Sequence, residues 1–126
     1  MPQVQVVFYQ EGSKVPSKDW LDRLSNNEQD ACYERLETLR DRGYELGFPA
    51  AEHLGDGIWE LRVRVKKVRL RMLYFFHERK TVVVTHGFHK DTAKVPPIEI
   101  KRAKQRRLSY QADPESRAFH WERDNE

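Results

Sequence analysis

The chain has 126 residues, 34% of which are charged, and its formal net charge is +3. This length fits one domain that can bury a core of its own. Cys32 is the single cysteine, so no intramolecular disulfide can form, which indicates a reducing compartment. The first residues lack the basic flank and apolar run of a signal peptide, and no apolar run approaches the length of a membrane span. We therefore expect a cytoplasmic protein that does not associate with membranes.

Positive charge is concentrated in one block of the chain. Residues 60–107 carry 15 Lys and Arg against 4 Asp and Glu, a net charge of +11 over 48 residues. Residues 1–59 carry a net charge of −5, and residues 108–126 carry −3. Such a block is typical of a protein that binds polyanions, nucleic acids among them. The alternative is a solvated surface whose charge is balanced by the acidic first half.

The first half of the chain predicts one strand and two helices. Alternating apolar residues predict a strand over residues 3–9, with Val7 half-exposed. A short helix follows, with Ser17 as its N-cap. An apolar stripe with helical spacing predicts a second helix over about residues 28–42. Residues 44–57 contain several glycines and a proline, and we expect them to form a loop.

The second half predicts a meander of three strands and a basic helix. The strands are expected over residues 58–65, 68–77 and 81–88, joined by tight turns. Two prolines then introduce a strongly basic helix over about residues 98–108. The order of elements is therefore β-α-α-β-β-β-α. It predicts an α+β fold with a small antiparallel or mixed sheet and helices packed on it.

The C-terminal segment has no hydrophobic periodicity. We expect residues 1–109 to form the domain and residues 110–126 to form a polar, mobile tail. Phe119 and Trp121 are the residues of this tail that could dock on the domain.

Charged side chains alternate along the first two strands of the meander and are expected to share one sheet face. Like charges on neighbouring strands repel each other, so an anionic guest on this face would offset the cost. RNA phosphate fits, because guanidinium groups bind phosphate bidentately. Alternatively, the arginines pair with acidic residues of the protein itself. The residues concerned are Glu60, Arg62, Arg64, Arg69 and Arg71.

The segment from residue 86 to 96 connects the last strand to the basic helix. It carries His89, Lys90 and Lys94 at the end of a predicted sheet, where functional side chains are often found. His89 is a candidate general acid or base near neutral pH, and it could equally be a structural or merely exposed histidine. The two lysines are candidate phosphate ligands. The full set of expected RNA-binding residues is Arg64, Lys66, Lys67, Arg69, Lys94, Lys101 and Lys104.

Metal and cysteine chemistry find little support in the sequence. His86 and His89 are predicted to point to opposite faces of their strand, which argues against a shared zinc ion. Carboxylates are scarce in the basic block, so a two-metal nuclease lacks ligands. Cys32 belongs to the apolar stripe of a helix and is expected to pack in the core. We therefore expect no metal and no cofactor.

Three ordered motifs resemble those of RelE/HigB-like toxins from type II toxin–antitoxin systems, in particular the phage-derived branch. Residues 54–62 read LGDGIWELR, residues 71–76 read RMLYFF, and residues 86–96 read HGFHKDTAKVP. Asp91 stands where the family usually has a second lysine. This change lowers the positive charge beside the expected site, or it gives Lys90 an ion-pair partner.

The resemblance implies an RNase-like fold and metal-independent cleavage of mRNA on the ribosome. It also implies neutralisation by a helix-turn-helix antitoxin of the HigA type. Arg62 and Arg71 are then the candidates for stabilising the transition state, and Lys90 for holding the scissile phosphate. His89 is the candidate acid or base. Glu60 is either a less favoured base or the partner that positions Arg62.

Two other functions remain open at this point. A ParE-like relative of the same fold would inhibit DNA gyrase and would not be an enzyme. A decayed toxin would be a non-catalytic module that binds RNA or protein.

Overall fold

The structure is a computed structural model in which residues 3–121 are described. Strands and helices follow one another along the chain without a long irregular insertion. The elements are β1 (Gln5–Tyr9), α1 (Pro16–Asp22), α2 (Asn26–Arg42), the 3-10 helix η1 (Gly43–Glu45), β2 (Ala51–Gly55), β3 (Ile58–Val65), β4 (Val68–His77), β5 (Thr81–His89), α3 (Pro97–Ala112), α4 (Pro114–Arg117) and β6 (Ala118–Phe119).

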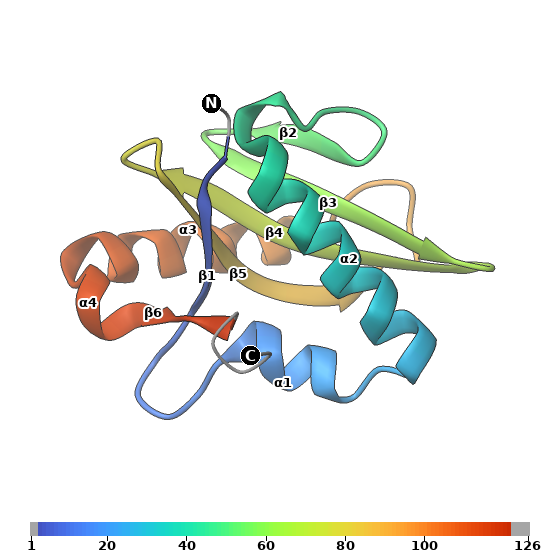
Figure 1. Cartoon of the computed structure of the whole chain (residues 1–126), viewed down its shortest axis with the longest axis horizontal. Helices are drawn as coiled ribbons and strands as arrows, with labels where there is room; N and C mark the ends of the chain where they lie inside the picture. Colours follow the sequence, from blue (N-terminus) through green and yellow to red (C-terminus); the bar gives the residue numbers. More distant parts are fainter. Residues whose placement is uncertain (1–2, 122–126) are drawn as a thin grey trace.

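The strands form one six-stranded mixed sheet in the order β2-β3-β4-β5-β1-β6 (Figure 1). Strands β2 to β5 form an antiparallel meander, whereas β1 runs parallel to β5. The predicted α+β class is confirmed. Among the described residues, no helix combines the length and the apolar character needed to cross a membrane.

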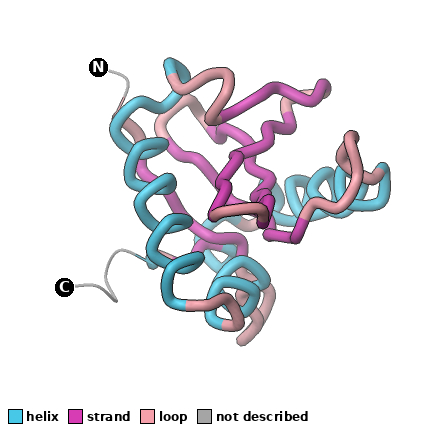
Figure 2. Tube along the Cα trace, turned by 90° about the vertical axis from the view of Figure 1, so that its right-hand side faces the viewer, coloured by secondary structure: helices cyan, strands magenta, loops and turns pink. Residues whose placement is uncertain are grey.

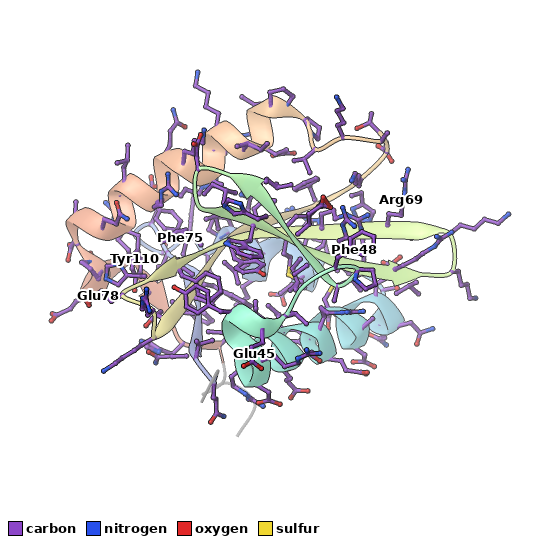
Figure 3. All side chains as sticks on the ribbon, turned by 90° about the horizontal axis from the view of Figure 1, so that it is seen from above. Glu45, Phe48, Arg69, Phe75, Glu78 and Tyr110 are labelled. Carbon is purple, nitrogen blue, oxygen red and sulfur yellow. The ribbon has the colours of Figure 1, made fainter. Side chains whose placement is uncertain are left out.

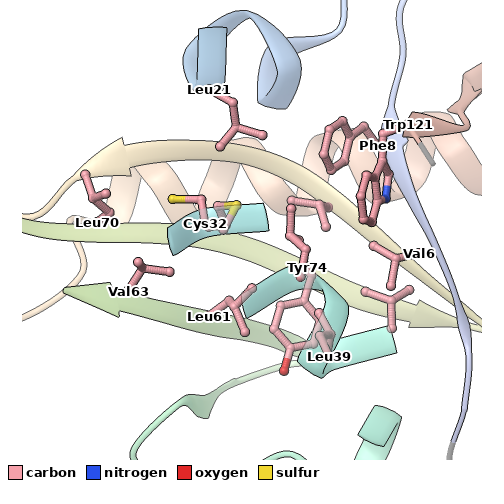
Figure 4. Close-up of a cluster of buried hydrophobic side chains, with 14 of the residues drawn as sticks. Val6, Phe8, Leu21, Cys32, Leu39, Leu61, Val63, Leu70, Tyr74 and Trp121 are labelled. Atoms are coloured by element: carbon pink, nitrogen blue, oxygen red, sulfur yellow. The ribbon is translucent and has the colours of Figure 1, made fainter. Parts of the chain in front are cut away.

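Helices cover both faces of the sheet, with α2 on one face and α3 on the other (Figures 2 and 3). Each side has its own buried apolar cluster. The larger cluster lies under α1 and α2 and contains Cys32, Leu36, Leu61 and Met72 (Figure 4). The smaller cluster lies under α3. Because the two faces are covered so differently, we call them the α2 face and the α3 face of the sheet.

The N-terminal elements differ in detail from the prediction. Val7 is buried rather than half-exposed, because α3 covers the second face of β1. Ser17 is not the N-cap of α1. The cap position is Val15, and the buried Ser17 hydroxyl donates to the carbonyl of Val84 at 3.2 Å. A capping box between Ser25 and its partner three residues on starts α2 at Asn26.

The predicted loop over residues 44–57 contains a strand. β2 pairs antiparallel with β3 and forms one edge of the sheet. Its sequence lacks the strict alternation of a half-buried strand. The strand exists because the edge of β3 supplies hydrogen-bond partners, which is a tertiary effect that local sequence does not encode.

Residues 110–121 pack on the domain, and Phe119 and Trp121, the two residues of the expected tail that could dock, both contact Phe8. α3 continues to Ala112, so the expected boundary after residue 109 falls inside a helix. β6 then pairs with β1, and Trp121 is 3% exposed with its ring stacked on Phe8 at 5.8 Å. The segment has no periodicity because isolated aromatic anchors, rather than a regular apolar face, attach it to the domain. The last residues of the expected tail, 122–126, lie outside the described residues.

Candidate functional site

The register of the β3–β4 hairpin brings the predicted arginines together. Arg62 lies directly opposite Arg71, and Arg64 lies opposite Arg69. Glu60 is opposite Leu73, whose side chain belongs to the apolar cluster under α3. The charged residues therefore share the α3 face, as their alternation predicted.

Glu60 is the centre of this arrangement. Its side chain is 1% exposed, and its two carboxylate oxygens accept from separate arginines. Oε1 accepts from Nε of Arg62 and Oε2 from Nε of Arg71, both at 3.0 Å. The ammonium group of Lys90 lies 3.4 Å from Oε2. We call these four residues the Glu60 cluster. A buried carboxylate with three cationic partners resolves the repulsion between facing arginines.

Lys90 reaches the cluster because the ladder extends one residue beyond β5. Its backbone N–H donates to the carbonyl of Arg69 at 2.9 Å. This bond directs the Lys90 side chain to the α3 face, where it is buried. Asp91 is exposed, and the carboxylate that pairs with Lys90 is that of Glu60.

The two arginines of the cluster keep hydrogen-bonding capacity for a ligand. Arg62 also donates through Nη2 to Glu52 of β2, and Arg71 donates through Nη1 to the carbonyl of Leu70. In the described structure, Nη1 of Arg62 and Nη2 of Arg71 have no hydrogen-bond partner. Burial lowers the pKa of Arg71, and the charge of Glu60 opposes that shift. A guanidinium stays charged despite such a shift.

A pocket of about 310 Å³ opens beside the cluster. Five arginines contribute to its walls, which gives it a strongly cationic lining. Pro49 and Ala50, which belong to the chain segment that leads into β2, also line it. Figure 3 shows Arg69 and Phe48 towards one end of the sheet, far from Glu78 and Tyr110 near the other. The arginines are Arg35, Arg62, Arg64, Arg69 and Arg71.

The structure does not bring His89 to the cluster. His89 lies opposite Leu70, which belongs to the core under α1 and α2. Its ring makes an edge contact with Trp20 of α1, with 5.8 Å between ring centroids. His89 is therefore on the α2 face, opposite to the face that carries the side chains of Arg62 and Lys90. The spacing of three residues places His86 and His89 on opposite faces of β5, and His86 is the one on the α3 face.

His86 points to the α3 face but serves the attachment of α3. Its Nε2 lies 3.1 Å from Glu99, and its Nδ1 lies 3.0 Å from the hydroxyl of Thr85. Burial, assisted by the nearby charge of Arg106, lowers the pKa of His86 to about 4, although Glu99 opposes the shift. The imidazole is thus neutral at neutral pH.

The other predicted RNA-binding residues form no single group with the Glu60 cluster. Lys66 and Lys67 are exposed in the turn between β3 and β4. They lie in sequence between Arg64 and Arg69, which line the pocket that we call the arginine pocket. Lys94 and Lys101 are exposed in the loop before α3 and on α3 itself. Lys104 pairs with Asp56 at 2.7 Å, so its charge is already matched.

Sequence reasoning missed three residues at this site. Arg35 comes from α2, Glu52 from the unrecognised strand β2, and Phe48 from the segment before it. Recognition of β2 as a neighbour of β3 would have located Glu52 beside Arg62. Nothing in the local sequence marks Arg35 or Phe48. Within residues 3–121, no group of three or more His, Cys, Asp or Glu side chains could hold a metal ion.

A mixed sheet between helices, with a cationic cluster beside an open pocket, defines an α+β domain consistent with the RNase-like toxin fold. Residues 19–108 match the model of the phage-derived Gp49-like proteins (DUF891), and the chain belongs to this family. The family is RelE/HigB-like and is associated with the toxins of toxin–antitoxin systems. Membership of this toxin family implies that a cognate antitoxin is the partner. No curated protein matches the chain.

Proposed function

We propose that this protein is a toxin that cleaves mRNA on the ribosome and so inhibits translation. The observation that carries the proposal is the Glu60 cluster, whose arginines face an open cationic pocket. Had internal ion pairs sealed the arginines away from solvent, an RNA phosphate could not reach them. The pocket and the unpartnered guanidinium nitrogens supply that access.

The proposed reaction needs RNA, the protein and solvent water. The ribose 2′-oxygen attacks the adjacent phosphorus, a new P–O bond forms, and the bond to the 5′-oxygen of the next nucleotide breaks. With no general acid or base assigned in this chain, the proton of the 2′-hydroxyl passes to solvent water, and the leaving 5′-oxygen takes a proton from solvent water. Negative charge grows on the phosphoryl oxygens in the transition state, where preorganised cations are most effective. Arg62 and Arg71, which line the pocket, stabilise that charge. Lys90, the sequence candidate for holding the scissile phosphate, is buried against Glu60 outside the pocket lining, so it adds positive charge from within the cluster.

Glu60 is assigned here to positioning. It holds the guanidinium groups of Arg62 and Arg71, both of which line the pocket, through their Nε atoms. His89 is left out of the proposal because its ring lies against Trp20 of α1 and it does not line the pocket. The catalytic contribution of this chain then consists of charge stabilisation and substrate orientation.

The cationic surface around the pocket extends the proposed contact with mRNA. Arg64, Arg69, Lys66 and Lys67 extend the cationic region along the hairpin and would contact neighbouring phosphates. Lys94, Lys101 and Lys104 would provide weaker contacts on the loop and α3. The proposed antitoxin is a HigA-like helix-turn-helix protein, and the proposed site of action is the cytoplasm, where ribosomes translate mRNA.

The test is induction of the protein in growing bacteria, followed by primer extension on translated mRNA. We expect new 5′ ends within coding regions for the wild type and their loss for Arg71→Ala and Arg62→Ala. Lys80→Ala is the matched control, because it removes one exposed charge from the β4–β5 turn and should leave cleavage intact. Circular dichroism would verify that each variant folds.

Two results would contradict the proposal. Intact transcripts together with accumulated gyrase–DNA cleavage complexes would identify a ParE-like gyrase inhibitor. Growth that is inhibited equally by the wild type and by Arg71→Ala, with intact transcripts, would identify a non-catalytic binding module.

A further inference from the structure

Phe48 is the most exposed of the large apolar side chains in the described part of the chain. It is 78% exposed, although burial of an aromatic ring is favourable by its area alone. A single exposed apolar residue is common on protein surfaces and needs no explanation by itself. The surroundings of Phe48 give it significance.

The segment that carries Phe48 is held against the arginine pocket. The carbonyl of Ala50 accepts from the backbone N–H of Arg62 at 2.8 Å, and Pro49 and Ala50 both line the pocket. The guanidinium carbon of Arg62 lies over the Phe48 ring, 5.4 Å from its centroid. One side of the ring thus faces a cation of the Glu60 cluster, and the rest of the ring is open to solvent.

An aromatic ring beside a cation suits a ligand that is itself both aromatic and anionic. Gly47 and Pro49, which flank Phe48, are exposed, and neither carries an aromatic ring. A protein partner with an apolar anchor would therefore meet a single exposed ring beside the Arg62 guanidinium, and the cost of removing water from that charge disfavours an apolar contact. A nucleotide in a single strand presents a planar base for the ring and a phosphate for the pocket.

We propose that Phe48 is a stacking platform for an unpaired nucleobase of single-stranded RNA, whose phosphate occupies the arginine pocket. The inference rests on the proposed function, since it names a subsite for the same substrate. Stacking depends on the planar face that every base has, so the subsite tolerates any base sequence but requires an unstacked strand. A base-paired duplex would not offer a free face.

The experiment measures binding of a fluorescently labelled single-stranded 2′-O-methyl RNA by anisotropy, because this oligonucleotide cannot be cleaved by 2′-oxygen attack. A second oligonucleotide has the same sugar–phosphate chain with abasic residues. We expect Phe48→Ala to weaken binding of the first about 5- to 100-fold and to leave binding of the second unchanged. Phe48→Trp should retain or strengthen the binding of the first.

Leu108→Ala is the matched control, because Leu108 is also exposed but lies on α3. It should leave both affinities unchanged. Equal losses for the two oligonucleotides, or no loss on Phe48→Ala, would overturn the inference, as would the absence of wild-type binding. Loss of antitoxin binding without loss of oligonucleotide binding would show that Phe48 is a protein anchor and would also overturn it.

The outcome is separable from that of the cleavage test. If the wild type leaves mRNA intact while Phe48→Ala shows the base-dependent loss, the stacking subsite stands and the cleavage proposal fails. If the wild type cleaves mRNA and Phe48→Ala binds both oligonucleotides normally, the reverse holds.

Discussion

At the scale of single residues, Glu60 explains how two arginines can face each other across a hairpin. Arg62 and Arg71 are directly opposite, an arrangement that repulsion disfavours. The Glu60 carboxylate between them is almost fully buried. Its burial is tolerated because each of its two oxygens forms an ion pair with an arginine. The same contacts leave one terminal nitrogen of each guanidinium group without a hydrogen-bond partner in the described structure. Glu60 thereby links the stability of the sheet to the shape of the site.

This arrangement predicts that Glu60→Gln is strongly destabilising. The substitution leaves Arg71 and Lys90 buried without a counterion, which costs about 3–5 kcal/mol of unfolding free energy. Glu52→Gln is the matched control, because Glu52 is 42% exposed and pairs with Arg62 alone. It should cost less than about 1 kcal/mol. Urea denaturation followed by circular dichroism would measure both, and similar small losses would contradict the central role of Glu60.

At the scale of elements, the attachment of α3 depends on a buried histidine. His86 follows an irregularity in the β4–β5 ladder, and its imidazole reaches Glu99 in the first turn of α3. Arg102 and Arg106 of α3 also face this histidine, and both disfavour its protonation. The neutral imidazole is therefore part of the interface between helix and sheet.

The attachment of α3 should weaken in mild acid. The folded-state pKa of His86 is about 4, below the ordinary value of 6.5, so the unfolded chain binds a proton more readily in that interval. Stability contributed by this group is complete above about pH 6.5 and is lost as the pH falls towards 4. Thermal unfolding measured from pH 7.5 to 4.5 should show a smaller decline for His86→Gln than for the wild type. His89→Gln is the matched control, because His89 is exposed and lies on the other face of the sheet. This variant should follow the wild-type profile.

The segment over residues 118–121, which includes β6, is a second part of the chain whose contribution to stability can be tested. Trp121 and Phe119 both stack on Phe8 of β1, at 5.8 and 6.3 Å between ring centroids. Trp121→Ala would leave a cavity in the core under α2 and should cost about 3–5 kcal/mol in chemical denaturation. Ile98→Ala, at an exposed position of α3, should stay within about 0.5 kcal/mol. Equal stability of the two variants would mean that residues 118–121 do not anchor the domain.

At the scale of the whole molecule, the uneven distribution of charge acquires a spatial meaning. Residues 60–107 hold most of the positive charge, and their hairpin forms one side of the arginine pocket. The net charge of +3 understates the local field, because acidic residues are concentrated in the first half of the chain. Binding of a polyanion at this surface is therefore expected to depend on salt.

The salt dependence should be steep and should report on individual arginines. For a single-stranded RNA, the logarithm of the affinity falls by about 0.7 per phosphate contact for each tenfold rise in salt. Anisotropy titrations between 50 and 200 mM salt should give a slope that several contacts produce, and Arg69→Ala should reduce it by roughly 0.7. A flat titration would show that the hairpin is not the contact surface.

Several features of this protein could be read from local patterns. Period-two alternation in β3 and β4, joined by a short turn, allows few registers and so predicted that Arg62 and Arg71 share a face. The same alternation places His86 and His89 on opposite faces of β5. Only one of the two histidines can therefore share a face with the arginines. The class of fold followed from the order of elements and was confirmed.

Tertiary structure decided the rest. β2 exists because β3 offers it an edge, and the segment to Trp121 is ordered because Phe8 is there to receive it. The contacts of Glu60 with Lys90, and of Phe48 with Arg62, join residues that are distant in the chain. The sequence by itself determined which side chains share a strand face, because that depends on the backbone period alone. Which of them meet, and which stay open to a ligand, depended on packing between elements that no local pattern records.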